Sequence, residues 1–417
     1  MTSSPSTADS RAFPMSEREF VAMMALMQAL QALAVDAMLP ALGVMSRDLG
    51  VDSANQRQLV VGVFLLFGGL GALFPGAVAD RFGRRPVLIG CLAGYVVFSL
   101  AAALTGDFTA LLVMRAAAGF ISSGIMVMAT TIIRDRFTGD KMARTQSLVV
   151  MVFMFVPMIA PTLGQAVLLV ANWRWIFGIM AVLGVGITLW VMMRLPETMH
   201  PEFRQPIRVS AILGNMRDGL SHREAMGYVF GMALVQGALF GYINSSQQLV
   251  AEHFGAGENF PLIFGAMALM MVCTNLANSR IVMRFGARRV SHSALLAYIP
   301  LAALQLGLSI RGGETLWEFT AVMTLNLCLM GFLGANFSSI ALQPFGRSAG
   351  AAASVQTFVR MVGGSLLGAY IGQLYDGSPR PLATAMLLGG SGALLLVLYS
   401  ERGRLFKRRN MPAVPPI

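Results

Sequence analysis

Two short stretches, ADRFGRR at residues 79–85 and VMRFGARR at residues 282–289, repeat one pattern at two distant points of the chain. Each follows the second long apolar run of its half of the sequence. The longest polar segment, residues 195–223, separates six apolar runs from six others. Because the two stretches match in both sequence and position, they predict two related halves of six helices each.

The composition indicates that these helices lie in a membrane. Hydrophobic residues make up 56% of the 417 residues and charged residues 12%, whereas soluble domains carry about 25% charge. A run of about 20 apolar residues spans the ~30 Å hydrocarbon core, and backbone in lipid must satisfy its own hydrogen bonds. We therefore expect an all-α integral membrane protein with two six-helix halves around a central cavity and twelve transmembrane helices, at 17–44, 54–79, 86–105, 108–134, 143–170, 174–194, 224–250, 260–283, 291–310, 316–341, 349–374 and 380–400.

The polar segments divide the chain into five regions. We expect a cytoplasmic N-terminal tail at 1–16, which has no cleavable apolar core. The first six-helix half follows at 17–194, a cytoplasmic linker at 195–223, the second half at 224–400 and a basic cytoplasmic tail at 401–417.

The net charge of +11 is a signal of topology. With the N-terminus placed in the cytoplasm, 24 of the 31 Lys and Arg residues fall on the cytoplasmic side and five on the other side. Such a bias is typical of the cytoplasmic segments of membrane proteins. We therefore expect a multi-pass protein with both termini in the cytoplasm and the basic charge helped by anionic lipid, and we exclude nucleic acid as a partner.

Few residues are available for cofactor chemistry. The three cysteines lie far apart within apolar runs, so we expect no disulfide framework and no metal site. Neither of the two lysines follows the glycines of a phosphate-binding loop, which argues against ATP hydrolysis. The four histidines fall in loops or at helix ends. We expect no cofactor other than a proton as coupling ion.

The loop at residues 76–85 resembles a known family signature. Its glycine followed by D-R-x-G-R-R is similar to the loop between helices 2 and 3 of the major facilitator superfamily. Arg115 and Gly119 resemble the helix 4 pattern R-x-x-x-G, although Ala118 replaces the usual glutamine. Pro157, Pro161 and Gly164 resemble the helix 5 motif of proton-driven drug exporters.

Further residues resemble the Bcr/CflA branch of drug-efflux transporters. Asp36 to Pro40 is similar to its D-x-Y-L-P element, with Met38 in place of the tyrosine, and Arg134 with Asp135 also fits. The resemblance covers nearly the whole chain. It implies a monomeric antiporter in the plasma (inner) membrane that exports drugs or related small molecules in exchange for protons.

In this family the loop between helices 2 and 3 latches one conformation. A turn of about six residues needs Gly83, and Asp80 can accept amide hydrogen bonds or face a helix N-terminus. Arg84 or Arg85 can pair with Asp135 across the cytoplasmic face; the alternative is that these arginines only set topology. Since Met283 replaces Asp80 in the second half, we expect one half to carry the full latch, formed by Gly76, Asp80, Arg81, Gly83, Arg84, Arg85 and Asp135.

Charges within the apolar runs point to the mechanism, because an intramembrane charge is costly and usually functional or paired. Asp36 and Arg115 lie at matching depth, ~10–12 Å below the outer surface by helical rise. Desolvation favours a protonated Asp36 and a nearby arginine opposes it, so we expect Asp36 to carry the proton and Arg115 to be its coupling partner. The alternatives are a structural ion pair, or Asp36 bonded to backbone near a kink at Pro40.

The second half offers Arg360 as its only expected buried charge, and either substrate contact or pairing within the protein suits it. Other polar residues within helices are expected to line the cavity or to bond between helices. We predict substrate binding by Gln28, Gln31, Gln165, Gln236, Tyr242, Asn244, Asn326, Gln356 and Arg360, and helix bending at Pro40, Pro157, Pro161 and Gly164.

Other functions stay open at this point. Within transport, the alternatives are proton-coupled uptake and export of a dedicated metabolite. An integral membrane enzyme using Asp36 or Asp135 is a remote alternative, because no acid, base and nucleophile cluster in the sequence. A receptor that does not transport is a further one.

Overall fold

The computed structural model describes residues 14–406, apart from 52, 54, 138, 200–201, 203–213 and 215–221. Most of the predicted tails, 1–16 and 401–417, and of the predicted linker, 195–223, lies outside the described residues.

The described residues of the first half form eight α-helices and two short 3₁₀ turns. The 3₁₀ turns are η1 (Leu39–Ala41) and η2 (Gln56–Gln58), and the helices are α1 (Glu17–Asp36), α2 (Leu42–Asp48), α3 (Leu59–Gly71), α4 (Pro75–Phe82), α5 (Arg84–Leu104), α6 (Phe108–Arg136), α7 (Gly139–Val170) and α8 (Arg174–Arg194).

The second half contains six long α-helices and three short helical turns. The short elements are the π-helix η4 (Gln248–His253) and the 3₁₀ turns η5 (Gly257–Asn259) and η6 (Gln343–Ser348). The long helices are α10 (Arg223–Gln247), α11 (Phe260–Phe285), α12 (Ala287–Arg311), α13 (Leu316–Leu342), α14 (Ala349–Gln373) and α15 (Arg380–Ser400).

These elements confirm the predicted helical membrane fold. Ten helical segments of the described chain are long and apolar enough to cross a membrane, and α3 with α4 adds an eleventh span that is bent by 48°. α14 has 25 residues but is less apolar, since Gln356 and Arg360 lie within it. Each predicted span overlaps one of these segments or helices, and the bounds differ by a few residues.

Two helices are interrupted within the membrane region. The first span breaks after Asp36, and a 3₁₀ turn containing Pro40 leads into α2, as predicted. The second span bends between Gly71 and Pro75, a bend that we did not predict, although a proline that lacks an amide proton favours it. By contrast, α7 runs as one helix through Pro157 and Pro161.

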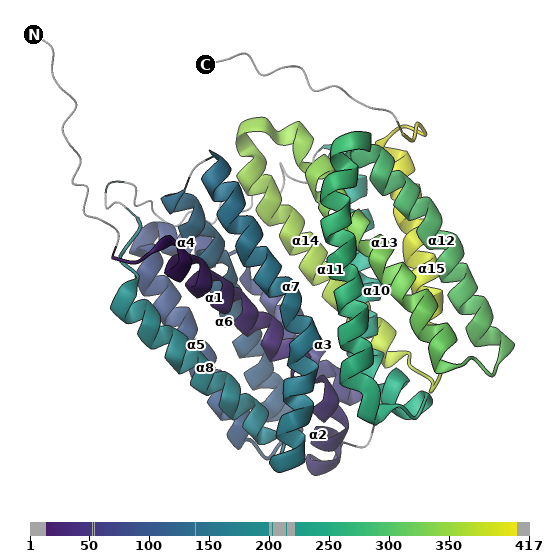
Figure 1. The fold of residues 1–417 in the computed structure, drawn as a ribbon, viewed down its shortest axis with the longest axis horizontal. Helices are drawn as coiled ribbons and strands as arrows, with labels where there is room; N and C mark the ends of the chain where they lie inside the picture. Colours follow the sequence, from purple (N-terminus) through teal and green to yellow (C-terminus); the bar gives the residue numbers. More distant parts are fainter. Residues whose placement is uncertain are drawn as a thin grey trace, which may run out of the picture.

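The same helix pairs pack in both halves. α1 lies on α7 and α8, as α10 lies on α14 and α15; α3 lies on α6 as α11 lies on α13; and α5 lies on α8 as α12 lies on α15. Between the halves, α3 packs on α14 and α11 packs on α7, which is also a symmetric pair. Figure 1 shows the first half in purple and blue beside the second in green and yellow, so the sequence repeat reflects a repeated fold.

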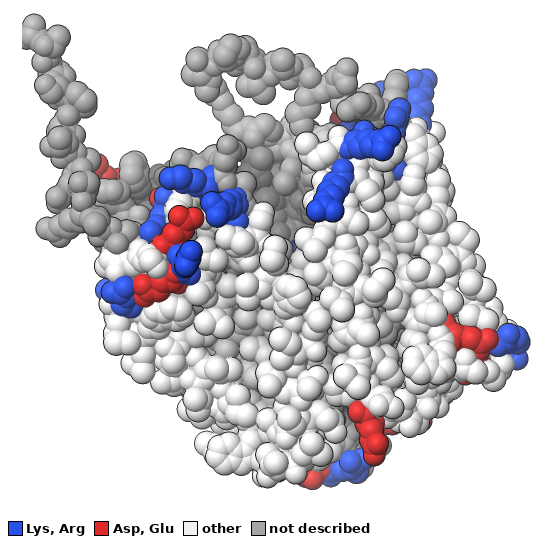
Figure 2. Space-filling model, viewed as in Figure 1, with Lys and Arg blue, Asp and Glu red and all other residues white. Residues whose placement is uncertain are grey.

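Basic side chains gather at one end of the molecule. We call this end, where α1 begins and α15 ends, the terminal face, and the other end the opposite face. Both RFG loops lie on the terminal face, at the α4–α5 and α11–α12 junctions, and Figure 2 shows Lys and Arg concentrated there. This distribution matches the predicted bias, and the orientation in the membrane stays a prediction.

Two glycines set the closest helix contacts of the first half. A Cβ on Gly164 of α7 would overlap the carbonyl oxygen of Ala37, directly after α1. A Cβ on Gly119 of α6 would overlap the carbonyl oxygen of Phe64 on α3. Small residues allow such backbone approach between membrane helices. Gly119, the glycine of the R-x-x-x-G pattern, is therefore a packing residue.

Replacing Gly119 by Ala should separate α6 from α3, because the obstructing atoms belong to backbone. Overpacking costs about 1–3 kcal/mol, so we expect a lower thermal unfolding midpoint of the purified protein in detergent. Gly90→Ala is the matched control, since no heavy atom lies within 4 Å of that Cβ position. Equal midpoints for the two variants would contradict this account of the contact.

Candidate functional site

Asp36 carries a buried carboxyl at the point where the first span breaks. It is the last residue of α1, its residue exposure is 6%, and within the described part of the chain its carboxylate forms no hydrogen bond or ion pair. Gly164 lets α7 approach the adjacent Ala37 closely. An unpaired carboxylate without water is costly, so this position favours the protonated acid and is suited to accept and release a proton.

Arg115 forms no ion pair with Asp36 within the described residues, which argues against the alternative of a structural pair, while its role as coupling partner stays a prediction. Its Nε donates to the carbonyl oxygen of Val60 on α3 and its guanidinium donates to that of Ala34 on α1, both at 3.0 Å. The ring of Phe64 lies 4.1 Å from the guanidinium carbon. The first and fourth spans are in contact, but the arginine binds backbone and an aromatic ring.

The break in α1 explains this arrangement. The last four carbonyls of a helix have no partner within the helix, and in a membrane they need another donor. The amide of Ala37 satisfies Leu33, and Arg115 satisfies Ala34. Arg115 thus caps the end of α1 two residues before Asp36, which makes it a residue that positions the carboxyl.

Arg360 lies mid-helix in α14 and forms no hydrogen bond or ion pair among the described residues. One turn earlier, Gln356 donates to Ser338 of α13 at 3.0 Å. The next residue, Met361, contacts the Cβ position of Gly69 on α3. Arg360 therefore lies beside the contact between the halves and has no partner among the described residues. Its contact with substrate stays a prediction.

Several of the other predicted substrate residues have contacts within the protein. Tyr242 donates to the sulfur of Met267 at 3.1 Å, and Asn326 donates to Val322 within its own helix. Gln28 is buried on α1, Gln165 is half-buried on α7, and Gln236 packs against Gly364 of α14. Their binding role is untested by this geometry.

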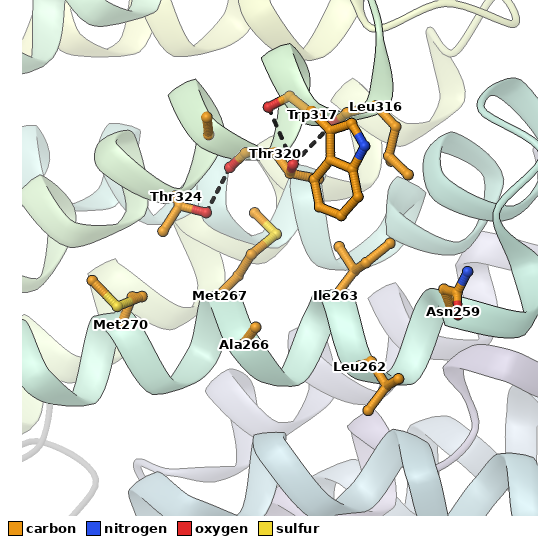
Figure 3. A pocket seen from close by; sticks show the side chains of 11 residues that line it. Asn259, Leu262, Ile263, Ala266, Met267, Met270, Leu316, Trp317, Thr320 and Thr324 are labelled. Atoms are coloured by element: carbon orange, nitrogen blue, oxygen red, sulfur yellow. Dashed lines mark hydrogen bonds between the residues drawn. The ribbon is translucent and has the colours of Figure 1, made fainter.

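One pocket has none of these residues in its lining, although its wall includes Met267, to which Tyr242 donates. It has a volume of about 470 Å³ between α11 and α13 near the opposite face, and Figure 3 shows Met267, Met270 and Trp317 around it. The hydroxyls of Thr320 and Thr324 in its wall donate to carbonyls of α13. Several lining side chains are exposed on the outside of the helices, so we regard it as a lipid-facing groove.

The predicted pairing of Arg84 with Asp135 is present. The buried Arg84 donates to Asp135 at 3.1 Å and to Asp80 at 2.7 Å, which ties α4 and α5 to the end of α6. Gly83 joins α4 to α5 with a φ of 102°, a conformation that favours glycine. No heavy atom lies within 4 Å of a Cβ on Gly76, and the exposed Arg81 forms no ion pair among the described residues.

Glu197 is a member of this cluster that sequence reasoning missed. Its carboxylate accepts from the backbone amides of Arg84 and Arg85 at 2.9 and 3.2 Å, at the N-terminus of α5, where a negative charge is favourable. A Cβ on Gly83 would lie 2.5 Å from this carboxylate. Only proximity in the fold could identify Glu197, since it follows α8 more than a hundred residues later.

The second half has a related network, which corrects one expectation. Arg288, at the start of α12, pairs with Glu401 after α15 at 2.8 Å and donates to Gln343 at 2.7 Å. Tyr228 donates to the same glutamate and also contacts His292. Our expectation of Arg360 as the only buried charge of the second half was therefore wrong. The expectation that one half carries the full latch stays a prediction, since Met283 and Gln343 stand where the first half has Asp80 and Asp135. Glu401 takes the place of Glu197, and Gln343 that of Asp135.

Polar contacts that join the halves gather at the opposite face. Asn55, Arg57 and Gln58 of the first half bond to residues of η4, of the end of α14 and of the segment that follows it in the second half. The arginine networks described above each stay within one half. The two halves are thus held together at the end remote from the RFG loops.

Comparison with known proteins gives a consistent result. Residues 24–368 match the family model described as Major Facilitator Superfamily. The chain is 26% identical over 400 residues to a bicyclomycin resistance protein homolog of Haemophilus influenzae, covering 94% of this chain and 98% of that protein. It is 28% identical over 343 residues to the multidrug resistance protein MdtL of Klebsiella pneumoniae, covering 80% and 83%.

A solved structure shares the fold. A bacterial homolog of the human lysosomal transporter Spinster, in an inward-facing and unoccupied conformation, superposes with a TM-score of 0.70. Its sequence is 15% identical, and the match covers 93% of this chain and 96% of that one. At this identity the likeness concerns the fold alone.

Replacing Arg115 by Lys should keep the charge but remove the guanidinium, whose nitrogens donate to carbonyls on two different helices. A buried acceptor without a donor costs about 1–3 kcal/mol, so we expect a lower thermal unfolding midpoint. If Arg115 acts only by capping α1, the pH at which transport is half-maximal should not move.

The control is Arg311→Lys, because Arg311 is an exposed arginine paired with Glu318 and its replacement should change neither quantity. A shift of the pH profile in Arg115→Lys at unchanged stability would restore Arg115 as a coupling residue.

Proposed function

Because the chain belongs to the Major Facilitator Superfamily, we propose that it exports small, lipophilic or amphipathic compounds in exchange for protons. The family and its relatives identify a transporter and set the enzyme alternative aside. The substrates would be drugs or related metabolites, since the relatives named above are a bicyclomycin resistance protein homolog and a multidrug resistance protein.

The observation that carries the proton step is the buried, unpaired carboxyl of Asp36. Within the described residues it has no cation beside it, while Arg115 is occupied by backbone. A proton is therefore the simplest charge partner for Asp36, and its loss would leave a costly anion. Entry of substrate or water beside α1 would change that cost, which links substrate to proton.

The fold also supports transport by opening the two ends in turn. The halves are internally tied by their own arginine networks, so each can move as a unit. They meet through α3–α14 and α7–α11 and are bridged by side chains at the opposite face. Breaking these side-chain contacts would expose the central residues at the opposite face.

Replacing Asp36 by Asn should uncouple transport, because an amide, unlike a carboxyl, does not take up or release a proton over the pH range of a transport assay. In liposomes containing the purified protein, we expect accumulation driven by a pH gradient to fall to the level of empty liposomes. Exchange of labelled for unlabelled substrate, which needs no net proton movement, should continue.

Asp107→Asn makes the same chemical change at the start of α6, where the aspartate accepts from the amide of Ala110 and asparagine serves equally well. It should transport normally. Unchanged gradient-driven transport by Asp36→Asn would remove Asp36 from the mechanism. A gradient imposed in each direction across a compound panel separates antiport from proton-coupled uptake.

A further inference from the structure

The side chains at the opposite face form a defined cluster, which we call the inter-half bridge. It consists of Asn55, Arg57 and Gln58 from the first half with Gln248, Glu252, Gln373 and Tyr375 from the second. Asn55 donates to the carbonyls of Gln373 and Tyr375 at 3.1 and 2.8 Å. Gln373 donates back to the carbonyl of Asn55 at 2.9 Å. Gln58 donates to Gln248, which in turn donates to Asn55.

The charged contact of the bridge is the ion pair of Arg57 with Glu252, at 2.5 Å. The arginine is buried, and the side chain of the glutamate is 44% exposed. Water therefore reaches one end of the pair, and its attraction is moderate. The pair holds the first half to the second without making the closure permanent.

Gln248 and Glu252 both stand on the π-helix η4 at the end of α10. Such helices are rare and are found preferentially at functional positions. The hydroxyl of Tyr375 also contacts the carbonyl of Gln248 at 3.4 Å. The second half thus presents its bridging residues from an irregular turn.

Beside these contacts lie buried polar atoms that have no partner among the described residues. They are both amide atoms of Asn244, the Oε1 atoms of Gln58 and Gln247, and Nε of Arg57. Asn244 and Gln58 are each 1% exposed.

The geometry of two glycines places these atoms in one region. A Cβ on Gly372 would meet both Gln58 and Asn244, and a Cβ on Gly43 would meet both Arg57 and Gln247. Closure therefore buries several polar groups at this one interface without giving them partners.

We propose that the inter-half bridge is a balanced gate, in which the Arg57–Glu252 ion pair holds the face closed and the unpaired amide of Asn244 favours its opening. Asn244 is thus a gate residue, which differs from the substrate contact predicted from sequence. Separation of the halves would admit water to its amide and recover hydrogen bonds that closure removes. The ion pair and the direct hydrogen bonds of the bridge oppose that separation.

This inference rests on the proposed function in one respect, because a gate is required only if the two ends of the molecule open in turn. The balance between contacts that close the face and groups that favour its opening makes the gate responsive. A face closed by well-paired groups alone would stay closed, whereas a face with opposing contributions of similar size can be shifted by substrate or proton binding elsewhere.

Electron spin resonance distances across the gate provide the test. Spin labels at Arg47→Cys and Glu258→Cys, exposed positions in different halves, would report the separation in the full chain with its three native cysteines replaced by alanine, in lipid nanodiscs. Glu252→Gln should lower the ratio of closed to open molecules by about threefold. Adding Asn244→Leu to that variant should raise the ratio by about tenfold, because the leucine has a similar size and no unpaired polar atoms.

The control for the ion pair is Glu318→Gln, which breaks a pair with Arg311 on the same face but within the second half. It should leave the distances unchanged. Labels at Arg47→Cys and Asp107→Cys, both in the first half, should report one constant distance. If Asn244→Leu does not fold, Asn244→Ala removes the same amide with less bulk.

An unchanged or more open gate in the Asn244 variants, or an unchanged gate in Glu252→Gln, would overturn the proposal. The measurement involves neither substrate nor a pH gradient. A failure here therefore leaves proton-coupled export standing, and a failure of proton coupling leaves the gate distances valid.

Discussion

The cost of placing a polar group in hydrocarbon without a partner governs this structure. It makes every spanning segment helical and requires a donor for each carbonyl that a broken helix releases. The break after Asp36 is tolerated because Arg115 reaches from α6 to the carbonyl of Ala34. At the carboxyl of Asp36 and the amide of Asn244 no partner is present among the described residues, and our proposals for proton transfer and for gating rest on these two groups.

The two halves are each held together by a corresponding arginine network on the terminal face. In each, an arginine directly after the RFG loop joins the end of the fourth span to a glutamate that follows the sixth. The first half uses Asp135 where the second uses Gln343, and Asp80 adds an ion pair where the second half has Met283. These networks tie the helices of each half together and do not cross the contact between the halves.

Particular residues show how far the sequence reaches into the site. Motif and position predicted that Arg84 or Arg85 pairs with Asp135, and helical rise placed Asp36 and Arg115 at matching depth. They did not reveal the backbone capping by Arg115, since carbonyl acceptors leave no trace in the side-chain sequence. Glu197, Glu401 and Glu252 were also missed, because their partners lie in other helices far along the chain.

The sequence by itself determined that this chain is a helical membrane protein with an internal repeat, because hydrophobicity, span length and charge bias act locally and can be counted along the chain. It also determined the family, because the loop at residues 76–85 is a contiguous motif. Only the tertiary structure decided which charges are paired, which are capped by backbone and which are left alone. Those outcomes depend on contacts between helices, and hydrophobic periodicity does not encode which side chain of one helix meets which atom of another.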